Sequence, residues 1–198
     1  MGWNESIKKE LKYCGSEVLI GECVFFTNPS GVVLNDRVRI DPFSLITTGL
    51  EVGSNVQICS HTVLGGGAKH TIYLGDWTFI GYGSKLFCGS ECYSGEYGPV
   101  NDFWGNNRVF HGDIRFNNYS GVASDVIVMP GIELPEGCKI AAKSFVYSSR
   151  LLKPWYVMMN KYSWKFWEGP KLKPYKRVNK GATEFFANQP DFLKHHKD

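Results

Sequence analysis

The chain has 198 residues, of which 43% are hydrophobic and 21% charged, and its formal net charge is +3. This length suits one domain around one core, and so mild a charge gives little support to nucleic-acid binding. The sequence has no apolar stretch of membrane-spanning length and no apolar signal core, and its six cysteines show no paired metal spacing, so we expect a cytoplasmic protein with reduced thiols.

The first predicted element is a short amphipathic helix over residues 3–14. Trp3, Ile7 and Leu11 are four residues apart and would share one face of this helix. We assign residues 1–15 to a helix that covers the open end of the following domain, because an uncovered strand edge invites aggregation.

Within residues 16–148 an aliphatic or phenylalanine side chain recurs at a spacing of six, with shifts and one long interruption, and this spacing matches neither the helical period of 3.6 nor the strand period of 2. Such a fixed internal period is typical of stacked repeats. Each hexad would form one short strand and one corner, and three hexads would form one coil of a triangular parallel β-helix. A β-sandwich is the alternative, but it would not keep one spacing through successive repeats. The repeated side chains are Ile20, Phe26, Leu34, Ile40, Ile46, Val52, Ile58, Leu64, Leu74, Ile80, Leu86, Phe116, Val122, Val128, Leu134, Ile140 and Val146.

A histidine and a glycine run stand out where the period shifts between Leu64 and Leu74. His61 occupies a corner position, and with three hexads per coil it would stack on Phe43, eighteen residues earlier. The run Gly65–Gly67 follows, then Ala68, Lys69 and His70. Glycine lets a ligand approach the backbone closely, so we predict a pocket edge here. The alternative is a corner histidine that hydrogen-bonds the backbone.

Residues 88–112 do not fit the period and are rich in glycine and aromatic residues. An insertion of this length in a compact domain is usually functional. We predict an extruded loop that packs on a neighbouring chain or stacks on a sugar.

Several segments resemble the hexapeptide-repeat acyltransferases. The run from Leu74-Gly75-Asp76 to Ile80-Gly81 is similar to their I-G-D-x-x-x-I-G repeat, Phe116 to Leu134 resembles their I-G-x-N…V-x-x-P-G-V-x-I segment, and Ile140 to Val146 resembles their closing I-G-A-G-S-V-V. The pattern is most similar to the branch that acetylates maltose, galactosides and surface polysaccharides. The resemblance implies an all-β, left-handed β-helix, a homotrimer with active sites at subunit interfaces, and acetyl-CoA as donor with no metal.

The resemblance also implies an acceptor site. The maltose and galactoside enzymes carry a catalytic histidine in a segment where this chain has Ser90 and Glu91, whereas polysaccharide-type relatives match Ser60-His61-Thr62 and Tyr93-Ser94-Gly95-Glu96. An unperturbed histidine, with a pKa of about 6.5, suits a general base. We therefore predict His61 as the base and Glu96 as its partner carboxylate. Tyr93, Ser94, Glu91 and His111 would bind the acceptor, with His111 and then His70 as the next candidate bases.

The coils over residues 113–146 resemble the groove that holds the pantetheine arm of acyl-CoA. Small residues would keep this channel open, although corner geometry alone can also require them. The expected cofactor-binding residues are Gly121, Ser124, Ala142, Lys143 and Lys161. Residues 149–198 read as a cap followed by a basic, aromatic arm that packs in the trimer or makes at most peripheral membrane contact.

The favoured function is acetyl-CoA-dependent O-acetylation of a sugar in surface-polysaccharide assembly. The first alternative is N-acetylation of an amino sugar linked to a nucleotide, since an amine needs less help from a base. A zinc enzyme of the γ-carbonic anhydrase type is a further alternative, because His61, His70 and His111 give the number of ligands, but the H-G-C signature is missing. A non-catalytic β-helix scaffold is the remaining one.

Overall fold

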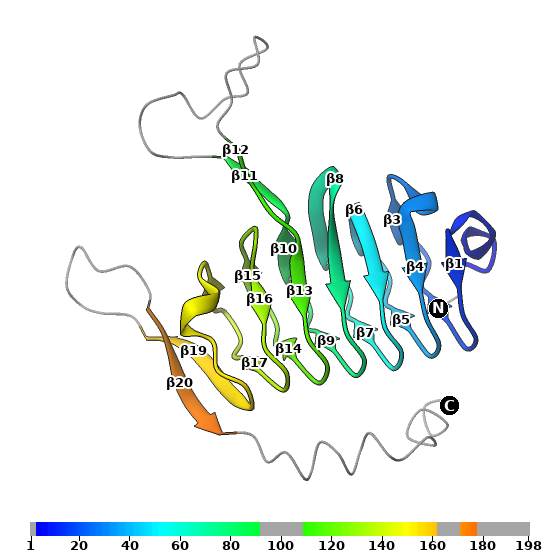
Figure 1. Cartoon of the computed structure of the whole chain (residues 1–198). Helices are drawn as coiled ribbons and strands as arrows, with labels where there is room; N and C mark the ends of the chain where they lie inside the picture. The colour runs from blue at the N-terminus through cyan, green and yellow to red at the C-terminus, as the bar shows by residue number, and fades with distance from the viewer. Residues whose placement is uncertain (1–2, 92–108, 162–170, 178–198) are drawn as a thin grey trace.

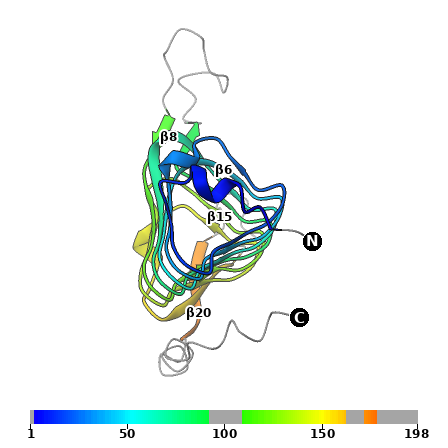
Figure 2. The ribbon, with the colours of Figure 1, turned by 90° about the vertical axis from the view of Figure 1, so that its right-hand side faces the viewer.

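The computed structural model describes residues 3–91, 109–161 and 171–177, and it forms a parallel β-helix of about six coils. In Figure 1 the coils succeed one another from the N-terminal end to the C-terminal end, and Figure 2 shows them along the axis as stacked triangles. The predicted all-β, β-helical fold class is confirmed.

Each coil contributes one strand to each of three faces. Face 1 contains β1 (Tyr13–Cys14), β4 (Val32–Leu34), the end of β6 (Leu45–Val52), the end of β8 (Val63–Leu74), β13 (Ile114–Phe116) and β16 (Glu133–Leu134). Face 2 contains β2 (Leu19–Ile20), β5 (Arg39–Ile40), β7 (Gln57–Ile58), β9 (Phe79–Ile80), β14 (Gly121–Val122), β17 (Lys139–Ile140) and β19 (Tyr156–Lys161). Face 3 contains β3 (Phe25–Phe26), the starts of β6 and β8, β10 (Lys85–Phe87), β15 (Ile127–Val128) and β18 (Phe145–Val146).

The strand register explains the six-residue period. Leu34 pairs with Val52, and Phe116 pairs with Leu134, so a regular coil takes 18 residues, or three hexads. Val52 pairs with Leu74, a step of 22, because extra residues bulge from β8. Leu74 then pairs with Phe116, because the insertion leaves the helix and returns to the corner that it left.

The repeated side chains form one continuous core, and every aliphatic residue of the predicted period is buried. Smaller buried residues stand two positions before them, as at Thr62, Ser84 and Ser144. Outward residues alternate with the inward ones, as the strand period requires.

The N-terminal segment differs from the predicted helix over residues 3–14. Only Ile7–Glu10 (η1) is helical, as a 3-10 turn, while β1 pairs with β4 and Trp3 bridges to Gly21. A helix this short is marginal by itself, so pairing with the first coil replaces it at both ends of the segment. Ile7 and Leu11 still pack against the core at this end.

The other irregular elements lie at corners and at the C-terminal end. Short 3-10 turns occur at Pro29–Gly31 (η2) and Ser149–Leu151 (η3), and β11 (Gly89–Glu91) pairs antiparallel with β12 (Val109–His111) at the root of the insertion. The strand β20 (Lys171–Arg177) pairs antiparallel with β19, and Met158 and Leu172 of this hairpin are buried. In the ranges that the structure describes, no helix is long and apolar enough to span a membrane.

Candidate functional site

The corner between face 3 and face 1 collects titratable side chains at the root of the insertion. Three elements meet there: the bulge of β8, the β11–β12 pair and the residue that precedes β13. They supply His70, His111 and Asp113 respectively.

The bulge of β8 brings His70 to the corner. Thr48 pairs with Gly67 whereas Gly49 pairs with Thr71, so the residues between Gly67 and Thr71 have no partner in β6. The Thr48 hydroxyl is buried and lies 3.0 Å from the Gly67 carbonyl oxygen and 2.7 Å from the His70 carbonyl oxygen, to which it can donate. Gly66 has a φ of 139°, and a Cβ there would lie 2.6 Å from the Cβ of Cys88, so the turn requires glycine.

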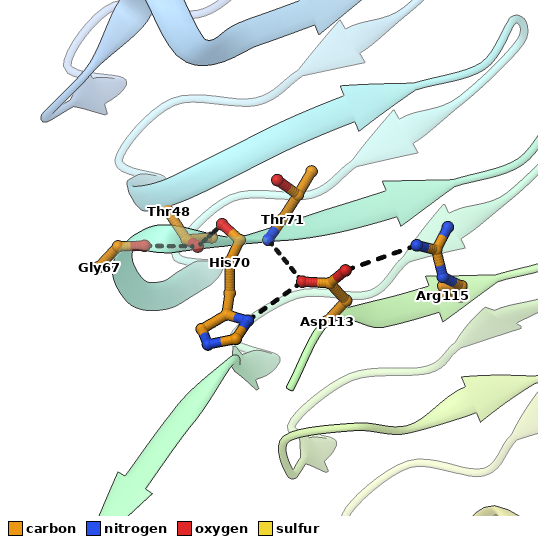
Figure 3. Close-up of polar contacts among 6 residues, drawn as sticks. All are labelled: Thr48, Gly67, His70, Thr71, Asp113 and Arg115. Carbon is orange, nitrogen blue, oxygen red and sulfur yellow. Dashed lines mark hydrogen bonds and ion pairs between the residues drawn. The ribbon is translucent and has the colours of Figure 1, made fainter. Parts of the chain in front are cut away.

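His70 and Asp113 form a hydrogen-bonded pair across this corner (Figure 3). The His70 Nδ1 atom lies 3.2 Å from Asp113 Oδ1, and the two side chains are 25% and 36% exposed. With the carboxylate ionised, Nδ1 carries the proton and donates. Among the described residues the other ring nitrogen, Nε2, has no hydrogen-bond partner, which is the arrangement of an oriented base.

Other groups hold Asp113 in place. The backbone N–H of Thr71 donates to Asp113 Oδ1 at 3.1 Å, and Arg115 Nη2 lies 3.5 Å from Oδ2 (Figure 3). The Thr71 hydrogen bond, followed by the contacts with His70 and Arg115, lowers the pKa of Asp113 below its ordinary value. The carboxylate therefore stays charged at neutral pH.

His111 completes the cluster. Its ring stacks on that of His70, with centroids 5.2 Å apart and an interplanar angle of 15°. Gly89, its partner across β11 and β12, leaves room, since a Cβ there would lie 3.2 Å from His111 Nδ1. The root of the insertion is thereby tied to the bulge that carries His70.

His61, the predicted base, lies at a different corner, between face 2 and face 3. It is exposed, has a φ of 60°, and stacks on Phe43 as the coil spacing predicts, with ring centroids 5.4 Å apart. The structure therefore brings His70 and His111 together and leaves His61 apart from them. Within the described residues no carboxylate makes a hydrogen bond or ion pair with His61. The assignment of His61 as base stays a prediction.

The predicted cofactor residues follow the His61 corner toward the C-terminal end. Ser124 is half-buried at this corner in the next coil but one, and Ala142 and Lys143 lie exposed one coil further on, where the Lys143 N–H donates to the Ser124 carbonyl oxygen. Gly121 is buried in β14, and a Cβ there would lie 2.7 Å from the Phe79 carbonyl oxygen, which gives it a packing role. The side chain of Lys161 lies outside the described residues.

The other predicted acceptor residues also lie outside this part of the chain. Tyr93, Ser94 and Glu96 belong to residues 92–108, and only the backbone of Glu91 is described, in β11. Their roles stay predictions.

Sequence reasoning missed Asp113. A signal was present, because the step of 42 residues between Leu74 and Phe116 also sets Asp113 level with Thr71, beside His70. Finding it required knowing that the insertion returns to the same corner.

No protein-family model matches the chain, and neither does any curated protein. Solved structures do. AntD, an N-acyltransferase from Bacillus cereus in complex with dTDP and 3-hydroxybutyryl-CoA, superposes with a TM-score of 0.78 at 22% identity over 96% of this chain and 94% of AntD. A variant of AntD in complex with dTDP-4-amino-4,6-dideoxyglucose and coenzyme A gives 0.80 at 23% identity over 96% and 95%. The hexapeptide-repeat acetyltransferase VCA0836 from Vibrio cholerae, with acetyl coenzyme A, gives 0.57 at 12% identity over 87% and 74%.

These likenesses establish a class by fold: the chain has the β-helical fold of the hexapeptide-repeat acyltransferases. Within that class, forms of the N-acyltransferase AntD match this chain over nearly its whole length.

Proposed function

We propose that this protein transfers an acyl group from an acyl-CoA to the amino group of a sugar linked to a nucleotide. The observation that carries the proposal is the fold match over almost the full length of both chains to an N-acyltransferase solved with a nucleotide and an acyl-CoA. This support favours the amine acceptor over the sugar hydroxyl that sequence motifs alone favour.

The His70–Asp113 pair is the best-oriented base in the described part of the chain. Asp113 fixes the tautomer of His70 and leaves Nε2 to accept a proton, while His61 has only a ring contact with Phe43. We therefore assign the base to His70 and keep His61 as the competing assignment.

The reaction needs one nucleophilic attack and the movement of one proton from the nitrogen to the sulfur. The neutral amine attacks the thioester carbonyl carbon, and the C–S bond of the resulting tetrahedral intermediate breaks to release the CoA thiolate. His70 Nε2 takes a proton from the nitrogen and returns it to the sulfur, so the products are an amide and free CoA. A backbone N–H at a corner next to a small residue can stabilise the oxyanion.

Apolar side chains on face 3 support the predicted homotrimer. The outward side chains of this face include Phe25, Leu45, Phe145 and Tyr147, which we call the face 3 strip; Phe25, Leu45 and Tyr147 are exposed, and the rings of Phe145 and Tyr147 stack. Exposed apolar side chains on one face favour an interaction surface, although the exposed Lys85 lies between Leu45 and Phe145. The strip lies between the His61 corner and the His70 corner, so a neighbouring subunit on it would border both. We propose this trimer with sites at its interfaces, and a cytoplasmic location where acyl-CoA is available.

O-acetylation of a sugar, as in surface-polysaccharide assembly, is the second candidate. The oriented pair of His70 and Asp113 favours it, because a hydroxyl is far less acidic than an ammonium group and needs a base more.

Paired acceptors separate the two candidates. Release of the CoA thiol would be followed with acetyl-CoA and 3-hydroxybutyryl-CoA, using dTDP-4-amino-4,6-dideoxyglucose and the matched nucleotide sugar with a hydroxyl at that position. Faster turnover of the amine supports N-acylation, and faster turnover of the hydroxyl supports O-acylation. Release that no acceptor stimulates, over a wider panel of nucleotide sugars, would contradict both.

A further inference from the structure

A polar groove crosses face 1 on the side away from the His61 corner. Its volume is about 310 Å³, and Asn35, Glu51, Tyr73, Arg115 and Asn117 are among the residues that line it. We propose that this groove binds a single sugar residue that carries an acidic group, a carboxylate or a phosphate. This goes beyond the acyl transfer proposed above and does not depend on it.

The groove exists because two side chains are missing from one column of the corner. Gly53 and Gly75 occupy successive coils between Asn35 and Asn117, which fill the same position in the coils on either side. The corner requires both glycines, since a Cβ would lie 2.5 Å from Asp76 Oδ1 at Gly53 and 2.5 Å from Asn118 Oδ1 at Gly75. The hollow spans two coils, roughly 10 Å along the axis at the usual strand spacing.

One wall of the groove holds a cation in a fixed position. The outward residues of three successive coils are Glu51, Tyr73 and Arg115. The guanidinium carbon of Arg115 lies 3.8 Å from the centroid of the Tyr73 ring, and its Nη2 is 3.5 Å from Asp113 Oδ2. Stacking and this single ion pair order the guanidinium, and its remaining N–H groups can donate to an anion.

The rest of the lining suits hydroxyl groups. Asn35 uses its Nδ2 to donate to the Val52 carbonyl oxygen at 2.9 Å, which leaves its Oδ1 as an acceptor. The Glu51 side chain, two coils from Arg115, makes no hydrogen bond or ion pair within the described residues, so it can accept from a pair of hydroxyls. A ligand with an anionic group at Arg115 and hydroxyl groups near Glu51 and Asn35 would be an acidic sugar.

The size of the groove agrees with one sugar ring. Its volume is at the lower end of the range for small-molecule sites, which is too small for a whole acyl-CoA. Neither His70 nor Asp113 lines the groove, and Arg115 contacts both the groove and Asp113. Binding in the groove can therefore be measured without acyl-CoA or an acyl acceptor.

The test is equilibrium binding of glucuronate, glucose 1-phosphate, glucose and inorganic phosphate to the full chain, by calorimetry or ligand-observed NMR. Glucuronate, glucose 1-phosphate or both should bind saturably, and the better of the two identifies the acidic group. Glucose and inorganic phosphate should each bind at least about tenfold more weakly, since each lacks half of the contacts.

Variants locate the site. Arg115→Gln should weaken binding about tenfold or more, and Arg115→Lys should fall between it and wild type, because lysine keeps the charge without the stacked fork. Arg150→Gln, an exposed arginine elsewhere, is the matched control and should bind as wild type does. The proposal would be overturned if no ligand bound saturably, if inorganic phosphate bound as well as the acidic sugars, or if a folded Arg115→Gln kept wild-type affinity. If Arg115→Gln does not fold, wild-type affinity in both Arg115→Lys and Glu51→Gln would overturn it.

Discussion

At the level of single residues, the proposed acyl transfer depends on which histidine accepts the proton. His70 has a carboxylate on Nδ1 and a second imidazole stacked on its ring, whereas His61 has a phenyl ring from the coil before it. A base is effective when a partner fixes its tautomer and orientation. The geometry therefore ranks His70 above His61.

Replacing His70 with glutamine should lower kcat/KM for acyl transfer by about 10²- to 10⁴-fold, the usual contribution of a general base. Initial rates of thiol release at saturating acyl-CoA measure this effect. The matched change, His61→Gln, should leave kcat/KM within about threefold, because the ring on Phe43 has no oriented proton-transfer role. A large loss in His61→Gln with an active His70→Gln would restore the assignment made from sequence.

The lowered pKa of Asp113 gives a prediction about stability and pH. A depressed pKa means that the folded state favours the ionised carboxylate, so its stabilisation is present above the unfolded value of about 3.9 and is lost as pH falls through the lower folded-state value. Asp113→Asn should therefore melt below wild type at pH 7, and the difference should close below about pH 4. Melting temperatures of the two proteins from pH 3 to pH 8 measure it.

A second carboxylate serves as the control for that comparison. Asp125→Asn removes an exposed carboxylate at the His61 corner and should change the melting temperature less than Asp113→Asn at pH 7. A difference between wild type and Asp113→Asn that stays constant down to pH 3 would contradict the linkage.

At the scale of elements, the bulge of β8 is what places His70. The buried Thr48 hydroxyl lies between the carbonyl oxygens of Gly67 and His70, which have left the strand ladder. The hydroxyl has one proton to donate, so its removal would take a hydrogen bond from one of these two carbonyl groups.

Thr48→Val should therefore destabilise the protein by about 0.5–1.5 kcal/mol, which is the usual net contribution of one hydrogen bond. Urea denaturation measures the free energy of unfolding. The matched change is Thr47→Val at the half-buried neighbouring position, for which we expect a change within about 0.5 kcal/mol. Equal effects of the two substitutions would show that the hydroxyl of Thr48 does not hold the bulge.

The coils were predictable from sequence, and the contacts of the insertion were only partly so. Residues such as Leu34, Val52 and Phe116 could be predicted as core residues, because a six-residue repeat of apolar side chains is typical of a β-helix, whose interior they fill. His70 and Asp113 are 43 residues apart, and their contact depends on where the insertion returns. The prediction of an N-terminal helix was wrong for a related reason. A short helix is marginal by itself, and Tyr13 and Cys14 pair with the distant strand β4 instead.

At the level of the whole molecule, face 3 exposes apolar side chains that another copy of the chain could cover. The face 3 strip runs along face 3 from β3 to the end of β18, although the exposed Lys85 of β10 divides it. Burial of such side chains against another copy would contribute about 25 cal/mol for each Å² of apolar surface.

Leu45→Glu should therefore convert a wild-type trimer to smaller species, because it puts a charge into the strip. Sedimentation velocity measures the mass. Leu19→Glu is a closely matched control, since Leu19 lies on face 2 with the same 37% exposure, and it should remain trimeric. Wild type that sediments as a monomer, or a trimer lost with Leu19→Glu and kept with Leu45→Glu, would contradict the assembly through face 3.

The proposed product is an amide on a nucleotide-linked amino sugar. The most direct measurement is mass spectrometry of dTDP-4-amino-4,6-dideoxyglucose and related amino-sugar nucleotides after incubation with the protein and acyl-CoA, before and after mild alkaline hydroxylamine. We expect an acylated acceptor whose added mass survives that treatment, as an amide does. An acylated product that hydroxylamine reverses, as it reverses an ester, or no acylated acceptor at all, would contradict it.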